Sequence, residues 1–516
     1  MKKTKIFLAM MLVVALLCSA TVLPVAADDV VSGEWGDLSW ELDKTTWHLT
    51  ISGSGEMESF PYSSSVDGWR IHKDSVQSVS IDADVTSLGN YAFYNFQSLT
   101  SVTFDENSQI TDIGSYAFAG CESLVSIEIP DGVTYIGNSA FNGCKLLEGV
   151  ALPSVLEYVG DSAFTGCEGL IEQVNGVSYV GQWAVACDAS ATSVALRDGT
   201  VGIGECAFAF CSDLESITPS SGLKHVGDFA FLYCESLTGI VFPSSMTTIG
   251  SSVFSGCSAL VEMKVETGNA VYHANGNCLI KTADKVLVVG CKASVIPSDG
   301  SVTSIGVGAF EECADLAELE IPSSVTRVAA SAFSGCTDLI SVDEGVGYVD
   351  GWVVSCEISA TTAVLSCDTV GIADGAFASC KYLEKVQYMG CEAAWDTVAV
   401  GSDNENLTQV LEYVGHAVKS WTVTVEATQE ADGLREGVCV CGEKVTEVIP
   451  KLPSEEKDEA TDDTTGATTT EDGGFIAKVK ALLPGCQSVT GGALSVALVS
   501  LSAALVAMKK KESEES

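Results

Sequence analysis

The chain repeats, ten times in variant form, the phrase Ile113-Gly114-Ser115-Tyr116-Ala117-Phe118-Ala119-Gly120-Cys121-Glu122-Ser123-Leu124. Each copy has an aliphatic residue followed in most copies by Gly, then Ala-Phe after two residues. A position that is usually Cys and then a Leu follow, each after two further residues. The central phenylalanines are Phe93, Phe118, Phe141, Phe164, Phe208, Phe231, Phe254, Phe310, Phe333 and Phe377. Five of the nine intervals between them are 23 residues, and the others are 25, 44, 56 and 44. Such a period is typical of a solenoid, in which each unit buries its apolar face by stacking on its neighbours.

Each repeat is expected to supply one short strand and one turn. In the pattern Leu-x-x-Ile-x-Ile-Pro, found from Leu124 to Pro130 and from Leu316 to Pro322, the first, fourth and sixth residues should face inward. The third and fifth should face outward, since side chains alternate along a strand. The segment around Phe118 is predicted to form one helical turn. The phenylalanine rings are expected to stack about 4.8 Å apart in one unbroken apolar spine.

The longer intervals indicate degenerate repeats. The segment Val180–Cys187 is interpreted as a worn copy with Val185 in the phenylalanine position, and Val349–Cys356 as another with Val354 there. The interval of 56 residues is interpreted as one or two longer coils.

Both ends of the chain carry sequence patterns typical of export or membrane insertion. Lys2, Lys3 and Lys5, an apolar stretch and Val25-Ala26-Ala27 have the order of a secretory signal peptide. Near the other end, Val489 to Met508 holds no charged residue and is followed by three lysines. Twenty helical residues span about 30 Å, enough for one membrane crossing with the lysines inside. We therefore expect an exported, single-pass protein with its N-terminal region outside, although a clipped tail replaced by a covalent anchor is the alternative.

These patterns divide the chain into eight parts. Alternating residues before and after the repeats suggest small β modules, and the Thr-, Asp- and Glu-rich stretch after them suggests a disordered stalk. The parts are a signal peptide (1–27), an N-terminal β cap (28–84), the repeat solenoid (85–411), a small β module (412–450), a disordered acidic Thr-rich stalk (451–474), a juxtamembrane segment (475–487), a transmembrane helix (488–508) and a cytoplasmic tail (509–516).

The charge of the chain excludes one class of partner. Its formal net charge is −43, so the phosphates of a nucleic acid would be repelled. No nucleic-acid partner is expected.

The cysteines are predicted to be buried small hydrophobic residues rather than a disulfide framework. Nine of the 20 occupy the same repeat position, which Phe96 fills in the first copy, so that position is apolar. Cys439 and Cys441, with His416 nearby, resemble half of a zinc site, but zinc needs four ligands. We expect no metal site and no cofactor.

No catalytic constellation is apparent. The five histidines lie in different regions, outside any Gly-x-Ser-x-Gly or His-Glu-x-x-His setting, so no catalytic residue is assigned and no enzyme is predicted. What remains is the row of outward strand positions, which should form a long shallow face. The candidate ligand-binding residues on it are Ser126, Glu128, Ser216, Thr218, Glu262, Lys264, Glu318 and Glu320.

The repeated phrase and the Ile-x-Ile-Pro strand end resemble the BspA-like leucine-rich repeat family of cell-surface proteins over roughly residues 85–390. The segments Trp47–Phe60, Gly390–Leu407 and Trp421–Leu452 resemble flanking segments of such proteins, although Gln429 replaces the first cysteine of the last one. The resemblance implies a β-rich α/β leucine-rich-repeat solenoid with the flanking parts given above.

The resemblance also implies a function. It suggests a non-enzymatic surface adhesin that binds protein ligands, such as host extracellular-matrix proteins or proteins of other cells. A carbohydrate-binding or cell-wall-associated scaffold is the alternative, and an enzyme in one of the small flanking modules is a third possibility.

Overall fold

The computed structural model describes residues 29–62, 68–416 and 418–452. The expected signal peptide, juxtamembrane segment, membrane helix and tail, and nearly all of the expected stalk, lie outside these residues. Among the helices that are described, none has the length and apolar character needed to cross a bilayer.

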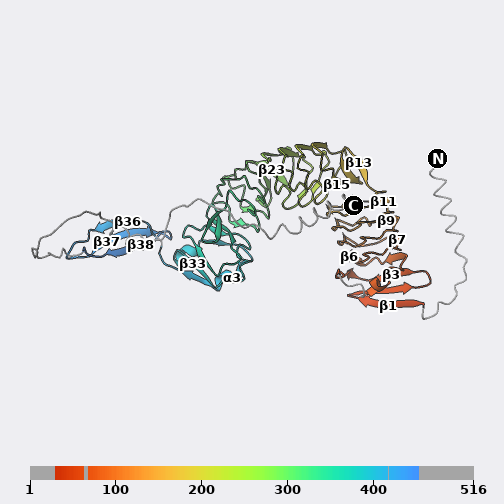
Figure 1. Cartoon of the computed structure of the whole chain (residues 1–516), viewed down its shortest axis with the longest axis horizontal. Coiled ribbons are helices and arrows are strands. Elements are labelled where there is room, and N and C mark those ends of the chain that lie inside the picture. Colours follow the sequence, from red (N-terminus) through yellow and green to blue (C-terminus); the bar gives the residue numbers. More distant parts are fainter. Residues whose placement is uncertain (1–28, 63–67, 417, 453–516) are drawn as a thin grey trace, which may run out of the picture. The chain divides into compact units, whose positions relative to one another are not determined.

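The array begins with an antiparallel meander that continues into parallel strands. Leu38, Leu42, Leu49 and Ile51 are buried and alternate with exposed residues on β2 and half-buried residues on β3, which fixes the register of the meander. Strand β3 then pairs in parallel with β5, and the sheet grows by one strand per coil (Figure 1). In order across the sheet, the strands are β1 (Val30–Trp35), β2 (Leu38–Asp43), β3 (His48–Gly53), β5 (Ser78–Ile81), β7 (Ser101–Phe104), β9 (Ser126–Glu128) and β11 (Gly149–Ala151).

Each coil also supplies a shorter strand to a second ladder, which follows the Ile-Gly part of the repeat. Its first strands are β4 (Gly55–Glu56), β6 (Val85–Leu88), β8 (Asp112–Ile113), β10 (Tyr135–Ile136) and β12 (Tyr158–Val159). Later coils continue both ladders. The longer strands are β16 (Ser193–Ala195), β18 (Ser216–Thr218), β20 (Gly239–Phe242), β22 (Glu262–Val265), β31 (Thr362–Leu365), β33 (Lys385–Tyr388) and β35 (Leu411–Tyr413). The shorter ones are β17 (Gly202–Ile203), β19 (His225–Val226), β21 (Thr248–Ile249), β26 (Ser304–Ile305), β27 (Arg327–Val328), β32 (Gly371–Ile372) and β34 (Ala399–Val400).

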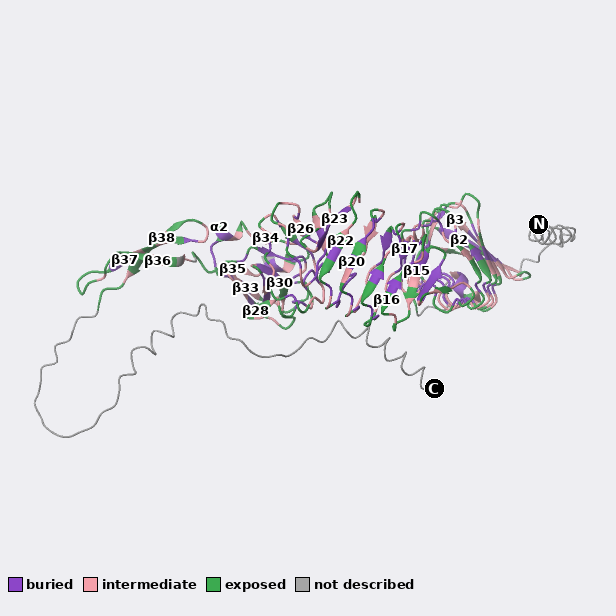
Figure 2. Cartoon of the chain, turned by 90° about the horizontal axis from the view of Figure 1, so that it is seen from above, coloured by how far each residue is buried: buried purple, intermediate pink, exposed green. Residues whose placement is uncertain are grey.

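The predicted alternation along the strands is confirmed in the clearest repeats. Leu124, Ile127 and Ile129 are buried, whereas Ser126 and Glu128 are exposed. Figure 2 shows buried and exposed residues alternating in the same way on β20 and β22.

The turn around each phenylalanine is not the helical turn that was predicted. Tyr116 has a φ of 59° and Gly120 a φ of 77°, so the backbone is left-handed two residues before and two residues after Phe118. The amides of Tyr116 and Phe118 donate to carbonyls of the next coil, 2.9 and 2.8 Å away. The amide of Ala117 donates within its own turn. A helix would keep all these bonds local, whereas the alternation ties neighbouring coils together.

The phenylalanine rings stack as expected, but in three runs rather than one unbroken spine. All ten repeat phenylalanines are at most 7% exposed. Ring centroids of neighbours lie 5.2–5.4 Å apart from Phe93 to Phe164, from Phe208 to Phe254 and from Phe310 to Phe333. The buried apolar residues correspondingly form three clusters.

Three-stranded antiparallel insertions cause these breaks. Val185 and Val354 do not fill phenylalanine positions, because each lies in the last strand of an antiparallel meander. In these strands the preceding residues, Ala184 and Val353, pair with Ile203 and Ile372 of the next coil, so the strands occupy the place of the Ile-Gly part of the repeat. The interval of 56 residues contains a third meander of this kind, whose last strand also pairs in parallel with the next coil. The strands are β13 (Glu172–Val174), β14 (Val177–Val180) and β15 (Trp183–Cys187); β23 (Tyr272–Asn275), β24 (Cys278–Lys281) and β25 (Val286–Val289); and β28 (Ser341–Asp343), β29 (Val346–Val349) and β30 (Trp352–Cys356).

A buried tryptophan fills the inserted coil in two of these places. Trp183 and Trp352 are each 2% exposed and lie against Gly202 and Gly371 of the next coil. A Cβ atom on either glycine would come within 2.5 Å of the indole ring. Each of these buried tryptophans therefore requires a glycine at the contacting position of the next coil.

After the last coil the chain forms a separate antiparallel sheet of three strands, β36 (Val418–Val425), β37 (Gly433–Cys439) and β38 (Lys444–Ile449). The described helices are short: a 3-10 turn, η1 (Gly68–His72), and α2 (Glu392–Trp395) and α3 (Glu405–Thr408). The guanidinium of Arg435 stacks over the Trp421 ring at 4.5 Å and bonds Glu447, which ties the three strands together.

Candidate functional site

All eight residues of the predicted ligand-binding face are exposed. Ser126 and Glu128 lie on β9, Ser216 and Thr218 on β18, and Glu262 and Lys264 on β22. Glu318 and Glu320 lie on a segment that does not form a regular strand, although the buried Leu316 and Ile321 keep it in the array. The eight residues are therefore all accessible to solvent and are spread over several coils.

The structure brings two of them together at one groove. Thr218 and Glu262 line an open groove of ≈ 670 Å³ that crosses β18, β20 and β22. Val241 and Val261, which are 45% and 42% exposed, also line the groove. Exposed aliphatic side chains in a hollow favour contact with an apolar group of a partner.

The groove lies where the ladder of longer strands is interrupted. Strand β18 pairs only with β16, and β20 pairs only with β22, so no strand pairing joins β18 to β20. At this point Pro219 stands where the strand pattern has its second inward isoleucine, the position of Ile129 in the repeat that begins at Leu124. Proline has no amide hydrogen to donate to a ladder and cannot continue a strand of this kind.

Two acidic residues line the groove beside its aliphatic side chains. Glu262 and Glu266 are both lining residues, and the Glu266 Oε2 atom accepts a hydrogen bond from the amide of Ser244 at 3.1 Å. The Glu262 Oε1 atom lies 2.5 Å from the Lys264 Nζ atom. One lysine balances one of the two carboxylates, which leaves the rim net acidic.

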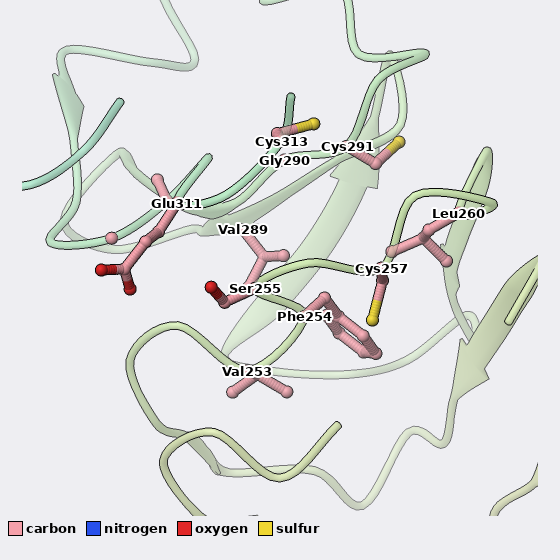
Figure 3. A pocket seen from close by; sticks show the side chains of 12 residues that line it. Val253, Phe254, Ser255, Cys257, Leu260, Val289, Gly290, Cys291, Glu311 and Cys313 are labelled. Atoms are coloured by element: carbon pink, nitrogen blue, oxygen red, sulfur yellow. The ribbon is translucent and has the colours of Figure 1, made fainter. Parts of the chain in front are cut away.

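A second hollow, next to Phe254, is too small for a ligand (Figure 3). The coil from Leu287 to Cys291 lacks the Ala-Phe part of the repeat, so the stack of rings stops at Phe254 and leaves a cavity of ≈ 10 Å³. Valine side chains and the thiols of Cys257 and Cys291 are among the groups that line it. This volume is about that of one water molecule.

Two described histidines lie beside serine or cysteine side chains that could act as nucleophiles. His416 faces the Cys441 thiol and belongs to the group of cysteines described below. The two ring nitrogens of His48 lie 2.7 Å from the Ser78 Oγ atom and 3.0 Å from the Ser80 Oγ atom. A nucleophilic serine needs a histidine that a third group orients. Both nitrogens of His48 are occupied by hydroxyl groups, which leaves no place for an orienting carboxylate.

One group of side chains has the composition of a metal site. The Sγ atoms of Cys391, Cys439 and Cys441 and a ring nitrogen of His416 all lie within 4.8 Å of one another. Three of these four residues were considered from the sequence. Cys391 was missed because it lies 48 residues before Cys439, and no local spacing points to it.

Comparison with known proteins identifies the repeats. A family model described as "BspA type Leucine rich repeat region (6 copies)" matches residues 71–183, 178–284 and 288–392, which together are more than half of the chain. A search of curated protein sequences gives no match.

Solved structures show similarity at low identity. A leucine-rich repeat protein from Eubacterium ventriosum is 21% identical, with 61% of this chain and 97% of that chain covered and a TM-score of 0.29. A leucine rich cell surface protein from Faecalibacterium prausnitzii is also 21% identical, with 73% and 99% covered and a TM-score of 0.26. The pneumococcal vaccine antigen PcpA is 16% identical, with 75% and 88% covered and a TM-score of 0.31.

The assignment rests on the family model and on the stacked repeats, since TM-scores of this size do not add to it. The matched segments coincide with the coils that carry the stacked phenylalanines. The chain belongs to the BspA-type leucine-rich repeat family.

Proposed function

We propose that this protein is a non-enzymatic scaffold of the bacterial cell surface that binds protein ligands in the groove over β18, β20 and β22. The family is surface-associated and acts through protein interaction. The observation that carries the proposal is the groove itself: Val241 and Val261 are exposed in a hollow with an acidic rim. A basic, partly apolar segment of a protein, of the kind found in extracellular-matrix proteins, matches this chemistry.

The proposal includes export and anchoring. The N-terminal pattern of residues 1–27 and the uncharged stretch 488–508 support a signal peptide and a single membrane span with the repeats outside. The meander β1–β3 supports the role of residues 28–84 as a cap, because it adds antiparallel strands to the edge that β5 would otherwise expose.

One observation favours a carbohydrate ligand as the second candidate. Tyr62 is 68% exposed, and its ring lies 5.6 Å from that of Tyr91 and 5.9 Å from that of Tyr94. Tyr91 stacks in turn on Tyr116 at 5.0 Å. A platform of tyrosine rings can stack against sugar rings, so binding at this end of the array would favour a cell-wall polysaccharide.

Adhesion of cells that display the full chain tests the proposal. Cells are applied to immobilised matrix proteins and to purified cell-wall polysaccharide, and bound cells are counted at low and high salt. We expect saturable binding to at least one matrix protein that weakens with salt, because the rim is acidic. Val241→Asp places a charge in the groove and should abolish the binding.

A matched variant separates the groove from general effects of a surface charge. Val155 is 47% exposed, like Val241, and lies in the turn after β11, so Val155→Asp should bind as the parent does. Retention on polysaccharide alone, lost in Tyr62→Ala, would replace the proposal with the second candidate. Adhesion that neither groove nor platform variants alter would contradict both.

A further inference from the structure

The group of Cys391, His416, Cys439 and Cys441 joins three separate segments of the chain. Cys391 is the residue immediately before α2, at the end of the repeat array. His416 lies between β35 and β36, and Cys439 and Cys441 lie at the turn between β37 and β38. Groups from the array, the connection and the three-stranded sheet therefore converge on one point.

Two of their separations are close to those of ligands around one zinc ion, and all four atoms lie within 4.8 Å of one another. Zinc–sulfur bonds of about 2.3 Å and zinc–nitrogen bonds of about 2.0 Å in a tetrahedron place two sulfurs about 3.8 Å apart, and a sulfur and a nitrogen about 3.5 Å apart. The Sγ atoms of Cys391 and Cys439 are 3.9 Å apart. The Cys441 Sγ atom and the His416 Nδ1 atom are 3.7 Å apart.

The turn that carries two of the thiols is held in shape. The amide of Cys439 donates to the carbonyl of Glu443 at 2.8 Å, and the amide of Gly442 donates to the carbonyl of Cys439 at 2.8 Å. Gly442 has a φ of 87°, a conformation that glycine adopts without strain. The closed turn places Cys439 and Cys441 on the same side as His416, without the Cys-x-x-Cys spacing that usually does so.

The second nitrogen of the histidine has a carboxylate partner. The Nε2 atom of His416 lies 3.5 Å from the Glu443 Oε2 atom, while its Nδ1 atom faces Cys441. A histidine that binds a metal through one nitrogen commonly donates the other N–H to a carboxylate, which fixes the ring and its tautomer. Glu443 is therefore a positioning residue for His416.

Two of the cysteines are buried, unlike surface cysteines that come close together without binding a metal. Cys391 is 8% exposed and Cys439 is 3% exposed, and both belong to the apolar cluster of the last coils. Cys441 and Val445 pack against the same cluster. His416 is exposed and closes the group on its solvent side. Three thiolates against an apolar cluster, with one imidazole, suit a divalent ion such as zinc in a tetrahedral site.

We propose that Cys391, His416, Cys439 and Cys441 bind one structural zinc ion that fastens the C-terminal three-stranded sheet to the last coil of the array. Each cysteine binds as a thiolate, so binding releases thiol protons to solvent. The site has four protein ligands and no open position, which makes it structural rather than catalytic.

Metal analysis of the full-length chain, purified in detergent under reducing conditions without chelators, tests the proposal. Inductively coupled plasma mass spectrometry should find about one zinc per chain in the parent. Cys391→Ser, His416→Ala and Cys441→Ser should each reduce the zinc content severalfold. Cys187→Ser, a half-buried cysteine of β15 outside the group, should leave it unchanged.

Further measurements exclude loss of zinc through general misfolding. Cobalt added to the metal-free parent should give the absorption of tetrahedral cobalt–thiolate coordination, and Cys441→Ser should lose that absorption while its array unfolds at the parent's denaturant concentration. Glu443→Gln should keep the absorption and bind zinc about 10–100-fold more weakly. Absence of zinc from the parent, iron in its place, zinc retained by all ligand variants, or a Cys391–Cys439 disulfide in the purified chain would overturn the proposal.

Discussion

The Asp374 Oδ2 atom accepts a hydrogen bond from the Arg327 Nε atom at 2.9 Å and forms an ion pair with a terminal nitrogen of the same guanidinium at 2.6 Å. The two residues are 47 positions apart, about two repeats, and the insertion β28–β30 lies between them in the sequence. At the corresponding place around the insertion β13–β15, the Glu205 Oε2 atom accepts a hydrogen bond from the Tyr158 hydroxyl at 2.5 Å. A part-buried side-chain bond thus joins the ladder of shorter strands across these two insertions.

Loss of this bond should weaken the array at the insertion. Arg327→Ala leaves the Asp374 carboxylate, whose side chain is 5% exposed, without its cationic partner. We expect the free energy of unfolding in urea to fall by about 1–2 kcal/mol, since the arginine is largely solvent-exposed and the pair is partly screened. Lys145→Ala breaks another pair between coils, but both of its partners are exposed, and the loss should be below about 0.5 kcal/mol. Equal losses in the two variants would contradict this account.

The stacked rings should dominate the stability of their run. Phe141 lies between Phe118 and Phe164, with centroids 5.3 and 5.4 Å away, and is fully buried. Phe141→Ala should reduce the free energy of unfolding by about 3–5 kcal/mol, because the buried ring leaves a cavity. Phe210 also stacks on a neighbour, Tyr233, but is 52% exposed, so Phe210→Ala should have an effect of less than about 1 kcal/mol. Denaturant titrations of both variants measure the difference.

Acid should destabilise the coils around His225. Burial is the main cause that lowers the pKa of this imidazole, against the smaller opposite effect of Glu157. Its ring is 9% exposed, lies 5.8 Å from the Trp183 ring and bonds Thr248. The unfolded chain then binds a proton near pH 6.5 that the folded chain resists, so stability is lost as the pH falls below that value.

The difference between the parent and His225→Gln isolates this contribution from other titrating groups. The parent should lose more stability between pH 8 and pH 5.5 than the variant, measured by urea unfolding at each pH. The same loss in both proteins would show that His225 does not contribute to the pH dependence.

The buried thiols should be unreactive in the folded chain. Burial raises the pKa of the Cys336 thiol to about 12, and that thiol donates to the carbonyl of Phe310 at 3.0 Å. Cys144 donates in the same way to Phe118. Since the thiolate is the reactive form, iodoacetamide at pH 8 should modify these cysteines only after denaturation. Mass spectrometry of the native and denatured chains measures this, and thiols that stay unmodified even when denatured would indicate disulfides.

The repeat positions were predictable because their spacing and polarity are local properties of the sequence. The period located all ten buried phenylalanines, and the Ile-x-Ile-Pro pattern gave the correct inward and outward residues around Ile127. The exposed positions of the candidate binding face followed from the same alternation.

The parts that could not be predicted depend on pairing over a distance. The sequence predicted that Trp183 belongs to a degenerate repeat, but in the structure it packs on Gly202. This arrangement follows from the pairing of Ala184 with Ile203, which is not a local property of the sequence. The groove depends on a strand pairing that is missing beside Pro219. The candidate zinc ligands required Cys391, whose contact with Cys439 arises from tertiary packing alone.

Hydrogen exchange of the full-length chain, with and without a matrix protein that supports adhesion, tests the central claim most directly. Binding in the groove should slow the exchange of backbone amides in β18, β20 and β22, and leave the tyrosine platform around Tyr91 unchanged. Protection confined to that platform, or to the side of the coils formed by the shorter strands, would contradict the assignment of the groove as the ligand-binding site.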